Sequence, residues 1–423
     1  MIKIVSSTQF DTKRSIDSGT EAQVRAVQEI LARVKAEGDA AVREYTERFD
    51  RVRLESFRVS EAEMAEAKEK VDLVVLEALQ EAAENIRDFH QRQVRQSWFS
   101  TKPSGTLLGQ IVRPLKRVGL YVPGGSAAYP SSVLMNAIPA QIAGVAEIII
   151  TTPPGKDGTI NPAILAAAQI AGVTQIYKMG GAQAIGALTY GTEQVPQVDK
   201  IVGPGNIFVA LAKREVYGLV DIDMIAGPSE IVVLADEMAE PRYIAADMLS
   251  QAEHDPLSSA VLVTTSRQLA ERVAVEIERQ VALLPRKEIA EASIRNHGAI
   301  CVVDSLDEGF DVVNRLAPEH LELLIDNPFE QLGKVENAGA IFLGAYSSEP
   351  VGDYFAGTNH VLPTNGAARF ASGLSVDEFV KKSSVVSYSK QDLARNGKKI
   401  IALAEQEGLT AHARAIEERL KDL

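Results

Sequence analysis

Apolar positions recur at helical spacing through most of the first hundred residues. Residues 20–50 and 60–94 carry apolar side chains three and four positions apart, with Gly38 as a break within the first segment. The second segment opens with the capping-box pattern Ser-x-x-Glu and continues in Ala, Glu, Leu and Lys, which favour helix. No strand pattern lies beside these helices. We therefore predict a helical region over residues 1–105 whose apolar faces pack on another domain or another subunit.

Beyond residue 106 the pattern changes to short apolar runs that alternate with helical stretches. Each run has the length of a strand and ends in glycine or proline. The runs occupy residues 118–125, 146–154, 175–181 and 199–205. Such alternation with short glycine joints is typical of a parallel, doubly wound sheet. We therefore predict a first α/β domain over residues 106–236.

A second series of strands and helices follows. Its apolar runs lie at residues 229–236, 259–266, 298–305 and 338–344. The chain then becomes helical and charged. We predict a second α/β domain over residues 237–376 and a helical tail over residues 377–423 that takes part in dimer contacts. The predicted fold class is α/β, with two Rossmann-like parallel-sheet domains, an N-terminal helical region and a C-terminal helical tail.

Composition and charge narrow the class of protein. The chain has 423 residues, of which 46% are hydrophobic, which is enough for more than one core. Its formal net charge of −13 disfavours nucleic acid or an anionic membrane as the main partner. No apolar run approaches the ~20 residues of a membrane span, and the first residues carry no stretch of signal-peptide length. With Cys301 as the single cysteine, we expect a cytoplasmic protein without an internal disulfide.

Glycine-rich turns follow several predicted strands, whereas the common nucleotide fingerprints are missing. The chain has neither G-x-x-x-x-G-K-[ST] nor G-x-G-x-x-G, which argues against a P-loop enzyme. The turns lie at residues 123–125, 179–186, 203–206 and 226–229. Any one of them could be an ordinary turn, because α/β proteins need glycine there. Together they indicate one ligand-binding edge, where backbone amides and helix N-termini can meet a phosphate.

The six histidines fall into two groups. We expect His90, on a charged helix, to be solvated, and His297, before a glycine, to end a helix. The other four occur in more distinctive surroundings. They are His254 in SQAEHDP, His320 in APEHLELL, His360 in GTNHVLPT and His412 in LTAHARA.

A metal site is one interpretation of these segments. Gln251 and His254 are three positions apart, so they share one face of a helix and could bind the same ion. The spacing alone leaves an ordinary polar helix end open. The candidates for the remaining ligands are Asp353, His360, His412 and the pair Glu319 and His320.

The adjacent Glu319 and His320 form a compact acid–base candidate. Pro318 restricts the entry to this segment, and histidine is the usual proton acceptor near neutral pH. A helix start with an acidic first turn is the alternative. Cys301 is flanked by apolar strand residues and there is no G-x-S-x-G elbow, so we expect a buried structural cysteine rather than a nucleophile.

Long ordered blocks of the sequence resemble histidinol dehydrogenases. The blocks lie at residues 120–144, 178–206, 222–231, 249–256, 317–323 and 351–364, and the resemblance extends from about residue 20 to the segment LTAHARAIEERL. It implies a homodimeric, zinc-dependent enzyme of histidine biosynthesis that oxidises L-histidinol to L-histidine through the aldehyde with two NAD⁺. The alternative is a related zinc and NAD dehydrogenase of another small alcohol, such as a sulfonated propanediol.

The resemblance also implies roles for individual residues. The implied zinc ligands are Gln251, His254, Asp353 and His412. The implied catalytic pair is Glu319 and His320, and the implied NAD contacts are Tyr121, Gln183 and Asn206. The implied substrate contacts are Ser229, His360 and Glu407, together with the zinc ligands and His320. Because Glu407 and His412 are far in sequence from the α/β core, we expect them to complete the active site of a partner subunit.

Overall fold

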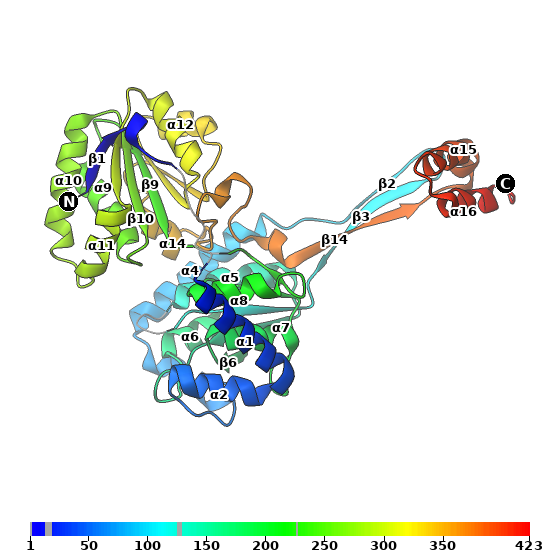
Figure 1. Ribbon diagram of the computed structural model, residues 1–423, viewed down its shortest axis with the longest axis horizontal. Coiled ribbons are helices and arrows are strands. Elements are labelled where there is room, and N and C mark those ends of the chain that lie inside the picture. Colours follow the sequence, from blue (N-terminus) through cyan, green and yellow to red (C-terminus); the bar gives the residue numbers. More distant parts are fainter. Residues whose placement is uncertain (1, 13–18, 125–128, 226) are drawn as a thin grey trace.

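Two parallel sheets and a long projecting arm make up the molecule (Figure 1). The computed structural model describes residues 2–12, 19–124, 129–225 and 227–423. Within these residues, no helix combines the length and the apolar character that crossing a membrane requires.

The first α/β unit is built on a sheet of five parallel strands. These are β4 (Arg117–Tyr121), β5 (Glu147–Thr152), β6 (Gln175–Lys178), β7 (Lys200–Val202) and β8 (Asp221–Ile222), in the order β6-β5-β4-β7-β8. The connecting helices are α5 (Pro130–Ala143), α6 (Pro162–Ile170), α7 (Gly181–Tyr190) and α8 (Ile207–Val216). The chain leaves β4 towards β5 and returns to its other side at β7. The switch point of the topology, where such sheets place their ligands, therefore lies between β4 and β7.

The second α/β unit contains a sheet of six parallel strands. These are β1 (Lys3–Ser6), β9 (Glu230–Ala235), β10 (Ser259–Thr264), β11 (Ala299–Val302), β12 (His320–Leu324) and β13 (Ala340–Leu343), in the order β1-β11-β10-β9-β12-β13. Its helices are α9 (Pro241–Ala252), α10 (Arg267–Val281), α11 (Lys287–His297), α12 (Leu306–Leu316), α13 (Pro328–Gln331) and α14 (Glu349–Tyr354). The two parallel sheets confirm the predicted fold class.

Four N-terminal helices cover the first unit. They are α1 (Glu21–Glu37), α2 (Asp39–Asp50), α3 (Glu61–Ala67) and α4 (Leu73–Gln91). The predicted capping box is present, because the Ser60 hydroxyl accepts from the amide of Glu63 and the Glu63 carboxylate accepts from the amide of Ser60. Helix α1 packs on α7 and α8, α3 on α6, and α4 on α5. The apolar faces of these helices are thus buried on the first α/β unit.

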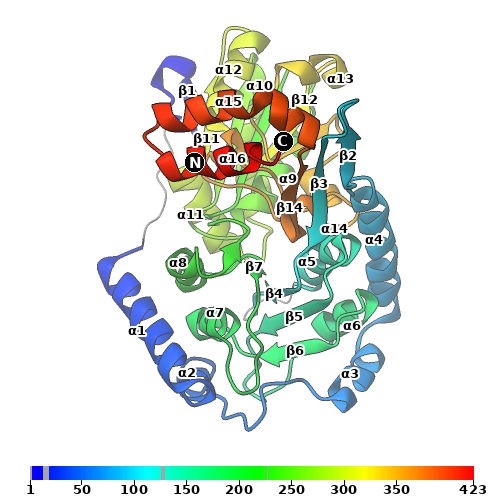
Figure 2. The same cartoon turned by 90° about the vertical axis from the view of Figure 1, so that its right-hand side faces the viewer.

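An antiparallel arm projects from the two units (Figures 1 and 2). It consists of β2 (Trp98–Thr101), β3 (Leu107–Pro114) and β14 (Val380–Ser387), in the order β14-β3-β2. Helices α15 (Lys390–Gln406) and α16 (Thr410–Leu420) form a pair at its tip. Short 3₁₀ turns complete the fold at Ser7–Gln9, Lys68–Lys70, Leu332–Lys334, Ala367–Arg369 and Val376–Phe379.

The structure corrects three boundaries. The region 1–105 is not only helical, since β1 pairs with β11 of the second unit and β2 belongs to the arm. The boundary at residue 236 is wrong because β9 pairs with β10 and β12 of the second sheet. The tail 377–423 is not only helical, since it contains the strand β14, which pairs along its whole length with β3. The partners of β1 and β14 are distant in sequence, which local periodicity cannot show, whereas β2 pairs with the nearby β3.

Candidate active site

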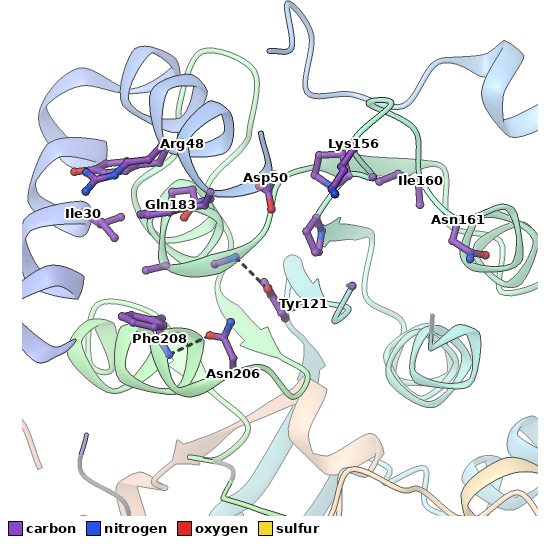
Figure 3. Close-up of a pocket in the computed structure, with 18 of the residues that line it drawn as sticks. Ile30, Arg48, Asp50, Tyr121, Lys156, Ile160, Asn161, Gln183, Asn206 and Phe208 are labelled. Atoms are coloured by element: carbon purple, nitrogen blue, oxygen red, sulfur yellow. Dashed lines mark hydrogen bonds between the residues drawn. The ribbon is translucent and has the colours of Figure 1, made fainter. Parts of the chain in front are cut away.

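A large cavity of about 1060 Å³ lies at the carboxyl ends of the strands of the first sheet (Figure 3). Tyr121, the last residue of β4, contributes to its wall, and Gln183 and Asn206 contribute from the starts of α7 and α8. The first amides of a helix have no partner within the helix, so a helix N-terminus attracts anions. The cavity therefore combines the switch point of the sheet with two helix starts. The structure brings all three predicted NAD contacts together here.

Three polar side chains that line this cavity retain a hydrogen-bond donor or acceptor for a ligand. The Tyr121 hydroxyl accepts from the amide of Gly181 at 3.0 Å, so its own proton remains available, and burial raises the pKa of Tyr121 to about 12. The Asn206 side-chain oxygen caps α8 by accepting from the amides of Phe208 and Val209, which leaves its NH₂ group to donate. The Gln183 oxygen is buried without a partner in the described part of the chain. These groups could bind the polar edges of a nucleotide.

The loop from Gly203 to Asn206 links this cavity to a second one. Asn206 lines the first cavity, whereas Pro204 and Gly205 line the second. A buried ion pair between Lys213 and Asp223 holds the loop: the amide of Gly203 donates to Asp223 at 2.7 Å, and the Lys213 ammonium donates to the carbonyl of Gly203 at 3.0 Å. The two cavities thus share one rigid wall.

Gly203 should be intolerant of any side chain. Its φ is +111°, and an added Cβ would lie 2.1 Å from the carbonyl oxygen of Tyr121. We expect Gly203→Ala to lower the free energy of unfolding by more than the ~1–3 kcal/mol of backbone strain alone, and to weaken dinucleotide binding. Gly218→Ala is the matched control, because Gly218 has a φ of +99° with no atom within 4 Å of its added Cβ. Equal losses for the two variants in urea denaturation would contradict the close-contact argument.

The second cavity, of about 240 Å³, lies between the two α/β units. Pro123, Pro204 and Gly205 contribute from the first unit. The second unit contributes the predicted residues Ser229, Gln251, His254, Glu319, His320, Asp353 and His360. Ser229 and His320 lie at the amino ends of β9 and β12, which is the opposite edge from the one that the first sheet uses. The site therefore lies where the carboxyl edge of one sheet meets the amino edge of the other.

Helix α9 brings the predicted glutamine and histidine to this edge. Gln251 is 1% exposed, and neither atom of its amide group has a partner among the described residues. A buried polar group without a hydrogen bond is costly, so the Gln251 side chain fits a bound ligand or ion better than an ordinary helix end. His254 follows the helix and is exposed. Asp255 is outside the cavity lining and accepts from the amide of Leu257 at 2.8 Å, which closes the turn.

The segment with Glu319 and His320 enters a strand, so the helix-start interpretation was wrong. Ala317, in a left-handed conformation with φ +46°, ends α12, and β12 begins at His320. The amides of Gly339 and Ala340 donate to the carbonyls of Pro318 and Glu319, both at 2.9 Å. This backbone pairing fixes the directions in which the Glu319 and His320 side chains point.

Hydrogen bonds define the protonation pattern of His320. Its Nδ1 lies 3.0 Å from the carbonyl oxygen of Glu230, which can only accept, so Nδ1 carries a proton in the neutral ring. The Nε2 atom is 3.4 Å from Asp353 Oδ1. Glu319 accepts from the amide of Glu230 at 2.9 Å. One backbone residue, Glu230, thus orients both members of the pair.

Burial and neighbouring charges shift the acidity of this pair. Burial raises the pKa of Glu319 to about 8, although the neighbouring His320 opposes the shift. For His320, burial lowers the pKa, but the carboxylates of Glu319 and Asp353 outweigh it and raise the pKa to about 10. The pKa values of both groups therefore depend on the charge of Asp353.

His320, Glu349 and Asp353 form a candidate metal site, since they offer ligand atoms within 4.8 Å of one another. Glu349 was missed in the sequence, although it precedes Asp353 by four positions and so lies on the same face of α14. It is 2% exposed and accepts from the Ser250 hydroxyl at 2.9 Å. Gln251, His254 and Asp353 line the same cavity. The structure thus supplies a group of nitrogen and oxygen ligands suited to a divalent ion.

His90 is buried, contrary to the expectation that it is solvated. Its Nδ1–H donates to the carbonyl of Ile86 at 2.8 Å, and its Nε2 accepts from the Asn359 amide group at 3.3 Å. The neighbouring His360 reaches the carbonyl of Asp353 at 3.0 Å and the Ser132 hydroxyl at 3.2 Å. His90 therefore supports the segment that carries His360. A helix with charged residues on its outer face still has a buried face.

Three other predictions from the sequence concern His297, Cys301 and the glycine turns. His297 is the last residue of α11, as predicted. Cys301 is fully buried in β11, outside both cavities, and burial raises the pKa of its thiol to about 11, which agrees with a structural role. Gly125 and Ala226, parts of two predicted glycine turns, lie outside the described residues.

Glu407 and His412 are not brought into this site by a single chain. Glu407 follows α15 and His412 lies in α16, both at the tip of the arm and both exposed. Figure 1 shows the arm tip well separated from the two α/β units. Within one chain, the cavity between the units therefore lacks two of the predicted residues.

Comparisons with known proteins identify the family of this chain. The sequence matches the family model described as histidinol dehydrogenase over residues 13–420. The histidinol dehydrogenase of Geobacillus kaustophilus is 64% identical, with 97% of this chain and 96% of the relative covered, and that of Bacillus subtilis is 58% identical, with 99% and 98% covered. The crystal structure of histidinol dehydrogenase from Elizabethkingia anophelis matches with a TM-score of 0.93 at 42% identity, over 97% of this chain and 95% of that one. This chain belongs to the histidinol dehydrogenase family.

Proposed function

We propose that this protein oxidises L-histidinol to L-histidine through L-histidinaldehyde, with two NAD⁺ and with zinc, in the last steps of histidine biosynthesis. The observation that carries the proposal is the meeting of two cavities at the loop Gly203–Asn206. One cavity is lined by Tyr121, Gln183 and Asn206, whose polar groups could bind a nucleotide. The other cavity is lined by Glu319 and His320. A nicotinamide that enters along this loop would reach the substrate beside His320.

His320 is proposed as the general base. Because its Nδ1 donates to the Glu230 carbonyl, Nε2 carries the lone pair and can accept the hydroxyl proton of the alcohol. Bound NAD⁺ would supply the oxidant by accepting the hydride from the same carbon, and this step would leave the aldehyde, NADH and a proton on His320.

Glu319 is proposed to act on the aldehyde. Water must add to the carbonyl, because only the resulting gem-diol has an O–H and a C–H to lose in a second alcohol-like oxidation. Glu319 is buried beside His320 and has its orientation fixed by the Glu230 amide, so it can polarise that water. Once His320 has released its first proton to solvent, it could accept a second proton from the gem-diol, and a second NAD⁺ would accept the hydride; the resulting acid then loses its proton to give the carboxylate. The buried Cys301, outside the cavity, is not needed.

Zinc is proposed to bind Gln251, His254 and Asp353, with His412 of a second subunit as the fourth ligand. Of the close group His320, Glu349 and Asp353, only Asp353 then binds the metal, and His320 stays free as the base. The unpaired, buried amide of Gln251 fits this role. A bound Zn²⁺ would neutralise Asp353, lower the pKa of His320 towards the range of a base, and offer positive charge to the substrate's nitrogen atoms. Its neutral ligands would leave most of that charge available.

We propose a homodimer in which each arm completes the partner's site with Glu407 and His412. The arm exposes large apolar side chains along its strands, including Trp98, Phe99 and Val386. Exposed apolar surface on a thin projection is unfavourable in water and is typical of an interface. A second copy would cover this surface and supply the two missing residues.

A steady-state assay tests the activity. Purified protein with zinc, L-histidinol and NAD⁺ should form about two NADH per histidinol consumed, as two successive hydride transfers require. Sulfopropanediol in place of histidinol is the comparison substrate. NADH formation from sulfopropanediol but not from histidinol would replace the proposed substrate, and its absence with both would contradict the proposal.

Gln251→Ala should weaken zinc binding. Even the loss of a residue that only supports a metal ligand typically costs ~10–100-fold in affinity, so removal of a direct ligand should cost at least that much. Zinc content per subunit after dialysis against a competing chelator, measured by mass spectrometry, gives the result. Asp255→Asn is the matched control, since Asp255 lies four residues away and only closes the turn at Leu257. Unchanged zinc content in Gln251→Ala would remove Gln251 from the ligand set.

A further inference from the structure

The carboxylate of Asp50 lines the large cavity at the carboxyl ends of the first sheet, which is the proposed NAD⁺ site. Asp50 is the last residue of α2, and its Oδ2 atom is buried without a hydrogen-bond partner in the described part of the chain. No ion pair of Asp50 is present among those residues either. Figure 3 shows Asp50 among the labelled side chains around the cavity, with Tyr121 between it and Asn206 in that view.

The fold gains nothing from the charge of Asp50. Burial raises the pKa of Asp50 to about 6, and no cation in the part of the chain that the structure describes offsets this shift. A negative charge at the C-terminal end of a helix is also unfavourable, because the helix dipole is negative there. The next residue, Arg51, has a left-handed conformation with φ +59°, which turns the chain away after the carboxylate. Groups that cost stability in this way are found mainly at functional sites.

Other charged side chains around the cavity are exposed. Glu29 of α1, Arg48 of α2 and Lys156 of the loop after β5 all line it, and all three lie at its solvent side. Arg48 stacks on the ring of Phe49 at 5.5 Å. The buried Tyr121 of β4 is the other titratable group near Asp50. None of these side chains neutralises Asp50, so the carboxylate remains available to a ligand with hydroxyl donors.

We propose that Asp50 binds the hydroxyl groups of the adenosine ribose and thereby selects NAD⁺ over NADP⁺; this rests on the proposed NAD-dependent function. A vicinal diol offers two O–H donors to one carboxylate, whereas a 2′-phosphate would bring negative charge against it. The nicotinamide end must lie towards Pro204 and Gly205, because they open on the cavity of His320. The adenosine end is then directed away from this loop into the body of the cavity, to whose lining α2 contributes Asp50.

The experiment measures binding without substrate, using Asp50→Asn and the matched control Glu47→Gln. Glu47 is an exposed acid on the same helix, outside the cavity lining. Calorimetric titrations use NAD⁺, NADP⁺, ADP-ribose and nicotinamide mononucleotide. We expect Asp50→Asn to weaken NAD⁺ and ADP-ribose binding by about 10–100-fold, the range for a hydrogen bond to a charged group. Binding of the mononucleotide should be unchanged, and NADP⁺ should lose no affinity.

The melting temperature distinguishes a ligand-binding role of Asp50 from a structural role. Because burial raises the pKa of Asp50 in the folded state to about 6, its ionisation opposes folding fully above that pKa, and the penalty disappears only below the unfolded pKa of about 3.8, where the carboxyl is protonated in both states. Asp50→Asn should therefore melt higher than the wild type at pH 8, with no such gain near pH ~3. A lower melting temperature with unchanged NAD⁺ affinity would overturn the proposal, as would equal losses for NAD⁺ and NADP⁺. If wild-type protein binds NAD⁺ but does not oxidise histidinol, the proposed function fails while the result for Asp50 still stands.

Discussion

Replacing His320 by asparagine should lower kcat for histidinol oxidation by ~10²–10⁴-fold, which is the usual contribution of a general base. The asparagine NH₂ group could still donate to the Glu230 carbonyl, which now accepts from His320 Nδ1 at 3.0 Å. What the variant lacks is the lone pair of Nε2, so the hydroxyl proton has no acceptor. The measurement is the steady-state rate of NADH formation at saturating histidinol and NAD⁺, with the zinc content of each preparation determined in parallel.

Two further variants complete this test. His297→Asn is the matched control, since His297 is exposed at the end of α11 and lies outside both cavities. Glu319→Gln should slow the overall reaction but spare the first hydride transfer, because Glu319 is proposed to act on the water. A single-turnover experiment separates the two steps. A near-normal rate for His320→Asn with full zinc content would remove His320 from the role of base.

Two inactive variants should regain activity when their subunits are mixed. His320→Asn damages the site on the α/β units, and His412→Asn damages the arm tip, so each homodimer is inactive. After random subunit exchange about half of the dimers are heterodimers, and each holds one complete site made from an intact body and an intact arm. The mixture should therefore recover about one quarter of the wild-type activity. Activity is measured after unfolding and refolding of an equimolar mixture.

The control pairs two variants on the same part of the chain. A mixture of His320→Asn with Asp353→Asn should stay inactive, because both residues line the cavity between the units and every heterodimer site then carries one defect. Recovery in this control would mean that activity returns by some route other than sharing of arms. Failure of the first mixture, with heterodimers shown by native mass spectrometry, would mean that Glu407 and His412 do not complete a partner's site.

The candidate site illustrates how far local sequence can lead. Gln251 and His254 were found from their spacing of three positions, although His254 lies beyond the end of α9, and Glu319 and His320 were found from their adjacency. Glu349 had the same kind of signal, four positions before Asp353, but nothing in the spacing distinguishes it from a solvated glutamate. Asp50 had no signal, because its importance comes from burial beside a cavity that other segments form.

The sequence by itself determined the alternation of strands and helices, the capping box at Ser60, the burial of Cys301 and the ordered blocks that show the family. These follow from interactions over a few residues or from long stretches of matched sequence. Only the tertiary structure decided that β1 and β14 pair with β11 and β3, that His90 is buried, and that Glu230 orients His320. Backbone pairing, burial and hydrogen-bond geometry depend on segments that are distant in the chain. The distance in sequence had already led us to expect Glu407 and His412 in a partner's site, but only the tertiary structure shows that His412 is exposed at the tip of a projecting arm.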